Sequence, residues 1–149
     1  MYISRREAFL LAGSLGTVSL AGCTGFLSDD YLGLFLSNFQ DREHELTVEL
    51  FHPDADEYSE AIAYRGRFEL SPHSDEEGPE SDHQVLEEDI AESEPYIVSA
   101  ELSTAPVASR TYRFYPSVTG DEERDDLLSI DIRTDHENSA TYLSISQNR

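Results

Sequence analysis

Cys23 is the single cysteine among 149 residues, and its thiol is the strongest nucleophile that the sequence offers. A thiolate is well suited to alkylation, so attachment to a lipid donor is chemistry that this residue type favours. With no second cysteine, the chain can form neither an internal disulfide nor a zinc ribbon. In an exported chain a lone thiol therefore requires an explanation, as a reactive group or as an intermolecular bridge.

Metal binding has only weak candidates. No two of the five histidines lie within one helical turn or at zinc-finger spacing; they are His44, His52, His73, His83 and His136. His52, Asp54 and Asp56 could share a cation with Glu57, but their loop lacks the glycine and the terminal glutamate of an EF-hand. We therefore expect no specific metal site and no cofactor, although loose association of cations with the acidic loops stays open.

Catalytic motifs are missing from the sequence. It has no Gly-x-Ser-x-Gly elbow, no His-Glu-x-x-His pair and no glycine-rich phosphate loop. Asp135 and His136 fit a polar hairpin turn at 134–139 better than a catalytic triad with a distant serine. We expect the protein not to be an enzyme.

Arginines and aromatic residues alternate near residue 112, the one place where cations outnumber acids. Arg110, Tyr112, Arg113 and Tyr115 could form a contact surface for a partner or an acidic glycan, because Tyr and Arg are enriched in interface hot spots. The alternative is a core strand with Tyr112 and Phe114 facing inward and the arginines paired with carboxylates. We favour this structural interpretation.

The chain is strongly acidic: 31 Asp and Glu face 10 arginines, with no lysine, for a formal net charge of -21. Such a charge repels phosphates and excludes nucleic acid as a natural partner. It also argues against electrostatic adsorption on anionic lipids.

Three explanations for this acidity compete. Disorder is one, but 38% of the residues are hydrophobic and they recur regularly. A docking surface for a cationic partner is another, but the acids are spread along the chain. Adaptation to molar salt is the third, because screening at ~1 M reduces the Debye length to ~3 Å. The heavy use of Asp and Glu, with arginine as the only cation, resembles proteins of extremely halophilic archaea, and we favour this explanation.

Residues 1–22 have the organisation of an export signal. Arg5 and Arg6 form a basic start, residues 8–22 carry no charge, and small residues precede Cys23. The apolar run is shorter than the ~20 residues of a membrane span. A buried or interfacial helix is the alternative, but the run is not amphipathic. We expect residues 1–22 to be removed.

Leu20, Ala21, Gly22 and Cys23 resemble the lipobox of prokaryotic lipoproteins. The resemblance implies that the Cys23 thiol receives a lipid and that the mature chain begins there. Two acyl chains hold a protein stably on a membrane, whereas one is marginal. Residues 4–10 (SRREAFL) are similar to a twin-arginine export motif, except that Ala8 replaces a larger apolar residue, so general secretion stays open as a route.

The mature chain alternates apolar and polar residues, with few helix signals. We expect one domain over 31–149 after a short tether at 23–30, with an acidic, mobile loop at 71–83. The expected strands are 32–38 and 45–52, which look like a first hairpin, then 62–70, 84–90, 96–102, 109–115, 128–133 and a last strand around 143–145. Gly66 marks a bulge in the third of them or a close approach of another strand.

Seven or eight short strands with turns between them predict an all-β, antiparallel sandwich. The layout resembles the small Ig-like sandwich modules of exported haloarchaeal lipoproteins, although the Cys…Trp…Cys pattern of true immunoglobulin domains is missing. This resemblance implies a lipoprotein anchored by Cys23 to the outer face of a halophile's membrane.

As function we expect a non-catalytic structural or interaction module near the membrane surface, with an envelope or membrane protein as its partner. The tether of eight residues reaches about 25 Å when extended at ~3.3 Å per residue. The alternative is a small-solute or cation-binding module that assists a transporter.

Overall fold

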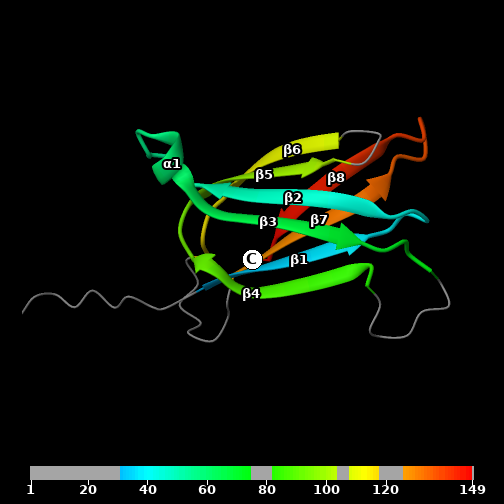
Figure 1. The fold of residues 1–149 in the computed structure, drawn as a ribbon, viewed down its shortest axis with the longest axis horizontal. Coiled ribbons are helices and arrows are strands. Elements are labelled where there is room, and N and C mark those ends of the chain that lie inside the picture. Colours follow the sequence, from blue (N-terminus) through cyan, green and yellow to red (C-terminus); the bar gives the residue numbers. More distant parts are fainter. Residues whose placement is uncertain (1–30, 75–81, 104–107, 118–125, 149) are drawn as a thin grey trace, which may run out of the picture.

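The computed structural model describes residues 31–74, 82–103, 108–117 and 126–148 (Figure 1). They form an all-β sandwich of two four-stranded sheets, with a one-turn helix between the second and third strands. The elements are β1 (Tyr31–Asn38), β2 (His44–Phe51), α1 (Tyr58–Ala61), β3 (Ile62–Leu70), β4 (Gln84–Glu92), β5 (Tyr96–Leu102), β6 (Ala108–Phe114), β7 (Asp126–Thr134) and β8 (Thr141–Gln147). Sheet A has the order β4-β1-β7-β8 and sheet B the order β3-β2-β5-β6.

Alternation of side chains decides which residues form the core, as the sequence predicts. In β5, Tyr96, Val98, Ala100 and Leu102 are buried while the residues between them are not, because successive side chains of a strand point to opposite faces. β2 and β7 follow the same period. The two inner faces meet in one core that is rich in leucine, isoleucine and valine.

Two expectations about strand pairing are wrong. β1 and β2 do not form a hairpin, because β1 belongs to sheet A and β2 to sheet B. The sandwich is not purely antiparallel either, since β1 runs parallel to β7 from Leu32, beside Asp126, to Asn38, beside Ile132. β1 is buried on both faces along most of its length, as expected of a central strand with parallel pairing.

The ends of the predicted acidic loop pack against the domain, contrary to the expectation that the whole loop would be mobile. The backbone N–H of Ser71 donates to the carbonyl of Asp82 at 3.2 Å, and that of His73 donates to Gln40 at 2.7 Å. The rings of His73 and His83 meet edge to face, with centroids 4.8 Å apart. Residues 75–81 of this loop lie outside the described residues.

Gly66 does not mark a bulge, because β3 stays in regular register with β2 on both sides of it. A Cβ atom at this position would collide with the Tyr64 hydroxyl and would lie 2.6 Å from Cε2 of Phe68. The expected close approach of another strand is therefore wrong too, because the space at Gly66 is filled by these two side chains of the same strand.

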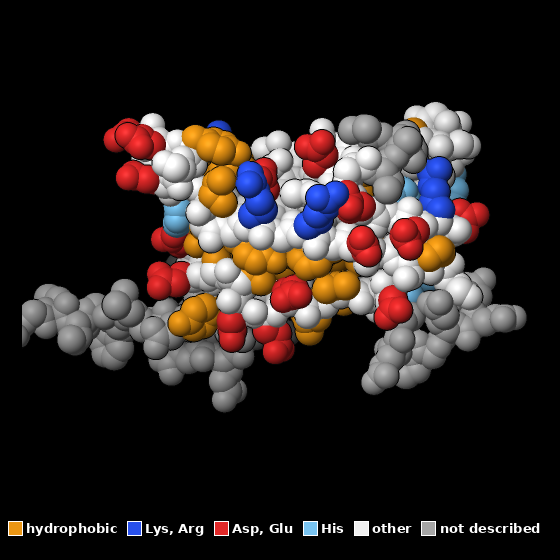
Figure 2. Space-filling view, viewed as in Figure 1, with side chains coloured by type: hydrophobic (Ala, Val, Ile, Leu, Met, Phe, Trp, Pro, Cys, Tyr) orange, Lys and Arg blue, Asp and Glu red, His pale blue; other side chains and the backbone are white. Residues whose placement is uncertain are grey.

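The two long sides of the sandwich differ. Between β6 and β8, Arg110 Nη1 donates to the carbonyl of Leu143 at 3.0 Å, and the Tyr112 hydroxyl lies 3.2 Å from Oε1 of Gln147. These contacts join the two sheets along one side. Along the other side, hydrophobic side chains are visible in a stripe between β3 and β4 (Figure 2).

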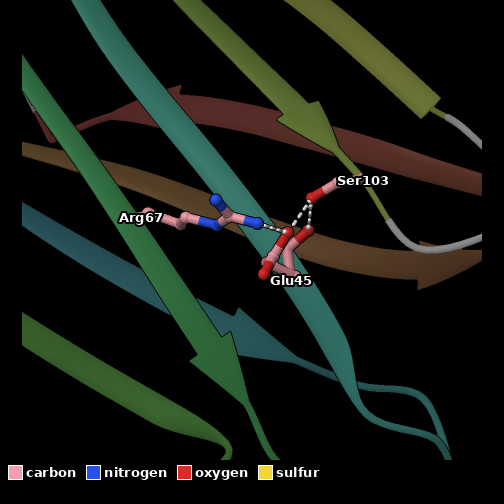
Figure 3. A network of polar contacts seen from close by, with 3 residues as sticks. All are labelled: Glu45, Arg67 and Ser103. Carbon is pink, nitrogen blue, oxygen red and sulfur yellow. Dashed lines mark hydrogen bonds and ion pairs between the residues drawn. The ribbon is translucent and has the colours of Figure 1, made fainter.

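Ion pairs and hydrogen bonds connect three strands on the outer face of sheet B. Glu45 on β2 accepts a hydrogen bond of 2.6 Å from Nη2 of Arg67 on β3 and another from the hydroxyl of Ser103, which follows β5 (Figure 3). These two donors hold the pKa of Glu45 below its usual value. Arg65 pairs with Glu49 in the same way. Arg65 and Arg67 are therefore neutralised by acids of the same face.

Candidate functional site

A shallow groove of about 280 Å³ lies at the end of the sandwich where β1 starts. Tyr96 and Phe114 belong to its lining; both are almost fully buried, and their rings stack with centroids 6.4 Å apart. Pro53 and Pro95 contribute to its walls. The groove therefore lies beside two buried aromatic rings, at the end of the domain where the described residues begin.

The strand ends explain this arrangement. Tyr96 is the first residue of β5 and Phe114 the last of β6, and the two pair directly in the antiparallel register. Pro53 follows β2 and Pro95 precedes β5, at positions where a residue without an N–H removes no bond from a sheet. Three strand ends thus place rings and prolines around one hollow.

Charge at the groove comes from Arg113 and Asp54, both exposed. Arg113 forms no ion pair with any residue that the structure describes, whereas Arg65, Arg67 and Arg133 each pair with a carboxylate. An unpaired guanidinium beside aromatic rings suits an anionic or planar group. The groove could therefore hold a small anionic group, but it offers no nucleophile activated by a base.

Tyr96 cannot act as a base here. Its hydroxyl lies 2.9 Å from the carbonyl of Glu92 and 3.1 Å from Oε1 of Glu94. Burial, followed by the nearby charge of Glu94, raises the pKa of Tyr96 far above the ordinary value of a phenol. The ring consequently stays neutral and serves as a wall and a hydrogen-bond donor.

The predicted cation ligands do not converge. Nδ1 of His52 lies 2.9 Å from Oε1 of Glu94, and its ring packs against Tyr96 at 5.4 Å between centroids. Asp54 lines the groove and Asp56 lies exposed on the connection before α1. Across the described ranges, no three His, Cys, Asp or Glu side chains are grouped to hold a metal ion.

The predicted partner surface is divided by strand alternation. Tyr112 turns inward, as expected, and Arg110 lies on the same face of β6, reaching β8. Arg113 and Tyr115 belong to the groove instead, and Tyr115 is 54% exposed. The expectation that these arginines pair with carboxylates is wrong for Arg110, whose partner is a backbone carbonyl, and Arg113 has no ion pair with a described carboxylate.

A buried polar cluster at the opposite end was missed by sequence reasoning. Nδ2 of Asn38 donates to the carbonyls of Arg42 and Ser71, both at 2.8 Å, while its Oδ1 accepts from the N–H of Gln40 at 3.0 Å. Asn38 is fully buried, so these bonds replace water that the amide has lost. The available signal was an asparagine at the end of an apolar strand.

Gln40 extends this cluster. Its Nε2 donates to the hydroxyls of Thr134 and Thr141, at 2.9 and 3.1 Å, and its Oε1 lies 2.6 Å from Nε2 of the buried His44. Burial, and then the charge of Arg42, lower the pKa of His44. The cluster links the β1–β2 connection to the β7–β8 hairpin, which is a structural role.

The predicted signal and lipid-attachment residues lie outside the described residues; they are Arg5, Arg6, Leu20, Ala21, Gly22 and Cys23. Within the described part of the chain, no helix has the length and apolar character needed to span a membrane. Comparison of the chain with protein-family models, with curated proteins and with solved structures finds no match.

Proposed function

We propose that this chain is a lipoprotein held by Cys23 on the outer face of a halophile's membrane, where it acts as a non-catalytic interaction module. The observation that carries the proposal is the Leu-Ala-Gly-Cys sequence at the end of a basic and then apolar segment, eight residues before the first strand. The thiol is the only one in the chain, so lipid attachment leaves no unexplained cysteine.

The fold supports an orientation for this anchored domain. β1 starts at Tyr31, at the same end as Tyr96, Phe114 and the groove. A tether from Cys23 to residue 30 reaches about 25 Å when extended at ~3.3 Å per residue. The groove then faces the membrane side, and the Asn38 cluster lies at the far end. Such a short tether favours partners in the membrane or envelope.

Replacement of Cys23 by serine tests the anchor in a haloarchaeal host. We expect the wild-type chain in the membrane fraction, labelled by a lipid precursor, with Cys23 as its first residue by mass spectrometry. Cys23→Ser should lose the lipid label and leave the detergent phase, because a hydroxyl is a far weaker nucleophile than a thiolate.

Thr24→Ser is the matched control, since it alters the neighbouring residue and should keep both the label and the cleavage site. A Cys23→Ser chain that is still labelled and cleaved before residue 23 would contradict the anchor. Arg5→Lys with Arg6→Lys separates the export routes, because only the twin-arginine route depends on the arginine pair.

The groove supports the second candidate, a small-solute binding module. Its volume of about 280 Å³ lies just below the ~300–1,000 Å³ of ordinary ligand pockets. A small anionic solute that binds there should raise the melting temperature, and Arg113→Ala should abolish this shift. Wild-type melting that does not respond to any of a panel of small carboxylates and phosphates would exclude this candidate.

A further inference from the structure

The side of the sandwich between β3 and β4 exposes part of the core. Tyr64 and Phe68 on β3 and Val85 and Ile90 on β4 are half-buried and pack against the core from this side. We name these four residues the seam. The stripe of hydrophobic side chains in Figure 2 follows it. On the opposite side, hydrogen bonds of Arg110 and Tyr112 connect β6 to β8, so the two sides of the sandwich are not equivalent.

β4 is built to resist pairing along its outer edge. Leu34 pairs with Glu87 but Leu32 pairs with Ala91, so β4 contains two extra residues in a bulge. Asp89 within it has φ 54°, a left-handed conformation. A bulge with charged residues is a common protection of an edge strand. A partner strand consequently has little access along β4.

β3 has no such bulge between Tyr64 and Leu70. Its register with β2 is regular from Tyr64 to Leu70, so it offers an uninterrupted edge to which the structure adds no further strand within the described residues. Its inner face presents Tyr64 and Phe68 on either side of Gly66. A segment that pairs with this edge would extend sheet B and cover the seam.

Charge decides what kind of segment fits. Glu87, Glu88, Asp89 and Glu92 are all exposed along β4, and none forms an ion pair with a described arginine. At the far end of the seam, a hollow of about 330 Å³ has Glu43, Glu69 and Asp82 in its lining. Glu87 pairs with the buried Leu34, so it lies on the inner side of sheet A, towards β3. Its charge contributes to raising the pKa of Tyr64.

A second copy of this chain does not match these charges. Arg65 and Arg67 are already paired with Glu49 and Glu45. Pairing two copies through β3 would bring together the acidic β4 strands of both. The occupant must therefore bring its own positive charge.

We propose that the seam binds an extended segment of a partner protein, apolar and basic, which adds a strand to the edge of β3. Its apolar side chains cover Tyr64 and Phe68, and its basic side chains neutralise Glu87 and the acids beside it. Main-chain bonds provide affinity and side chains provide selectivity in this mode of recognition. The proposal rests on the proposed function, since it specifies the partner of an interaction module.

The test uses the mature chain and a synthetic peptide of nine residues, the length of β3, composed of valine, threonine and lysine. The comparison peptide has glutamate in place of lysine. Binding is measured in about 1 M salt, where the Debye length of ~3 Å screens distant charges and leaves mainly the attraction between groups in direct contact. We expect the lysine peptide to bind and the glutamate peptide not to bind.

Two variants examine the seam. Phe68→Ser and Glu87→Lys should each weaken lysine-peptide binding by about tenfold, which corresponds to about 1.4 kcal/mol. Tyr58→Ser and Glu60→Lys are matched controls on α1, and both should leave binding within about twofold of wild type. Both residues are exposed, and Tyr58 is 67% exposed.

Hydrogen exchange locates the peptide. Binding should slow the exchange of β3 amides and leave that of β6 unchanged, although β6 is the other edge of the same sheet. Equal binding of the two peptides, equal effects of Glu87→Lys and Glu60→Lys, or protection on β6 would overturn the proposal. So would a dimer of the chain alone that Phe68→Ser dissociates. None of these outcomes affects lipid attachment at Cys23, which is measured separately.

Discussion

Arg110 on β6 donates a hydrogen bond of 3.0 Å to the backbone carbonyl of Leu143 on β8, and this bond joins the two sheets. Hydrogen bonds from charged groups are stronger than neutral ones, but this side chain is partly in water. Arg110→Ala should therefore lower the free energy of unfolding by about 1 kcal/mol in urea titrations.

Arg113 provides the matched control on the same strand. It has no ion pair with a described residue, so Arg113→Ala should change the free energy of unfolding by less than about 0.5 kcal/mol. Equal destabilisation by both substitutions would mean that the contact with Leu143 does not join the sheets.

Asn38 is the residue whose loss should destabilise the domain most at the end opposite the groove. Asn38→Ala removes one acceptor and two donors that satisfy backbone groups of Gln40, Arg42 and Ser71, the first in a buried bond and the other two in partly buried bonds. We expect a loss of about 2–3 kcal/mol in the free energy of unfolding, because each unsatisfied buried group costs about 1–3 kcal/mol.

Asn138 serves as the comparison, because its Oδ1 accepts a similar bond from the N–H of Ala140 at 2.9 Å in an exposed turn. Water replaces that bond when it is lost, so Asn138→Ala should cost less than about 1 kcal/mol. If Asn38→Ala were no worse than Asn138→Ala, burial of the cluster would have no energetic role.

The sequence predicted the faces of the strands better than their neighbours. Alternation from Tyr96 to Leu102 reveals which side chains are buried, since every second residue points to the core. It contains no information on pairing, so the partnership of β1 with β7 could not be foreseen, and proximity along the chain wrongly favoured a hairpin with β2. The unbroken apolar run Leu32–Leu36 was the sign of a central strand that the sequence contained.

Candidate sites were predicted less well, for a related reason. Asp54, Arg113 and Tyr115 were singled out in two unrelated groups, yet they line one groove. They meet because the last residues of β2 and β6 lie at the same end of the sandwich. This placement depends on the order of the strands in the sheet, which the sequence pattern does not contain. The Asn38 cluster was missed because the partners of Asn38 are backbone carbonyls and an N–H group. Every residue has these groups, so residue types along the sequence do not show which of them will bind Asn38.

Acidification should destabilise the protein through His44. Burial lowers the pKa of His44 in the folded chain from the ordinary 6.5. Below pH 6.5 the unfolded chain therefore binds a proton at His44, while His44 of the folded chain stays neutral until the pH is lower. This contribution to stability is present above pH 6.5 and decreases as the pH falls towards the folded pKa. Urea titrations at pH 7.5 and 5.5 measure it.

His44→Gln isolates this effect from the other histidines. Glutamine does not titrate, so the variant should lose less stability between the two pH values than the wild-type chain does. His136→Gln, at an exposed turn, should leave the wild-type difference unchanged. An identical pH dependence of the wild type and His44→Gln would contradict the assignment to His44.

Low salt should also destabilise the domain. The net charge of -21 includes rows of exposed acids such as Glu87, Glu88 and Asp89, which have no described cationic partner. The Debye length rises from ~3 Å at 1 M to ~10 Å at 0.1 M salt, so repulsion between these carboxylates increases on dilution. Melting followed by circular dichroism should show a falling midpoint between these two concentrations.

A triple variant separates screening from other effects of salt. Glu87→Gln, Glu88→Gln and Asp89→Asn together remove three neighbouring charges without changing size, so the midpoint should depend less on salt than in the wild-type chain. Sucrose at low salt provides the second comparison: it favours compact states by exclusion from the surface but screens no charge. Adaptation to molar salt through acidic surface charge requires the triple variant to melt higher than wild type at 0.1 M. A midpoint that does not change with salt in either protein would remove that explanation of the composition.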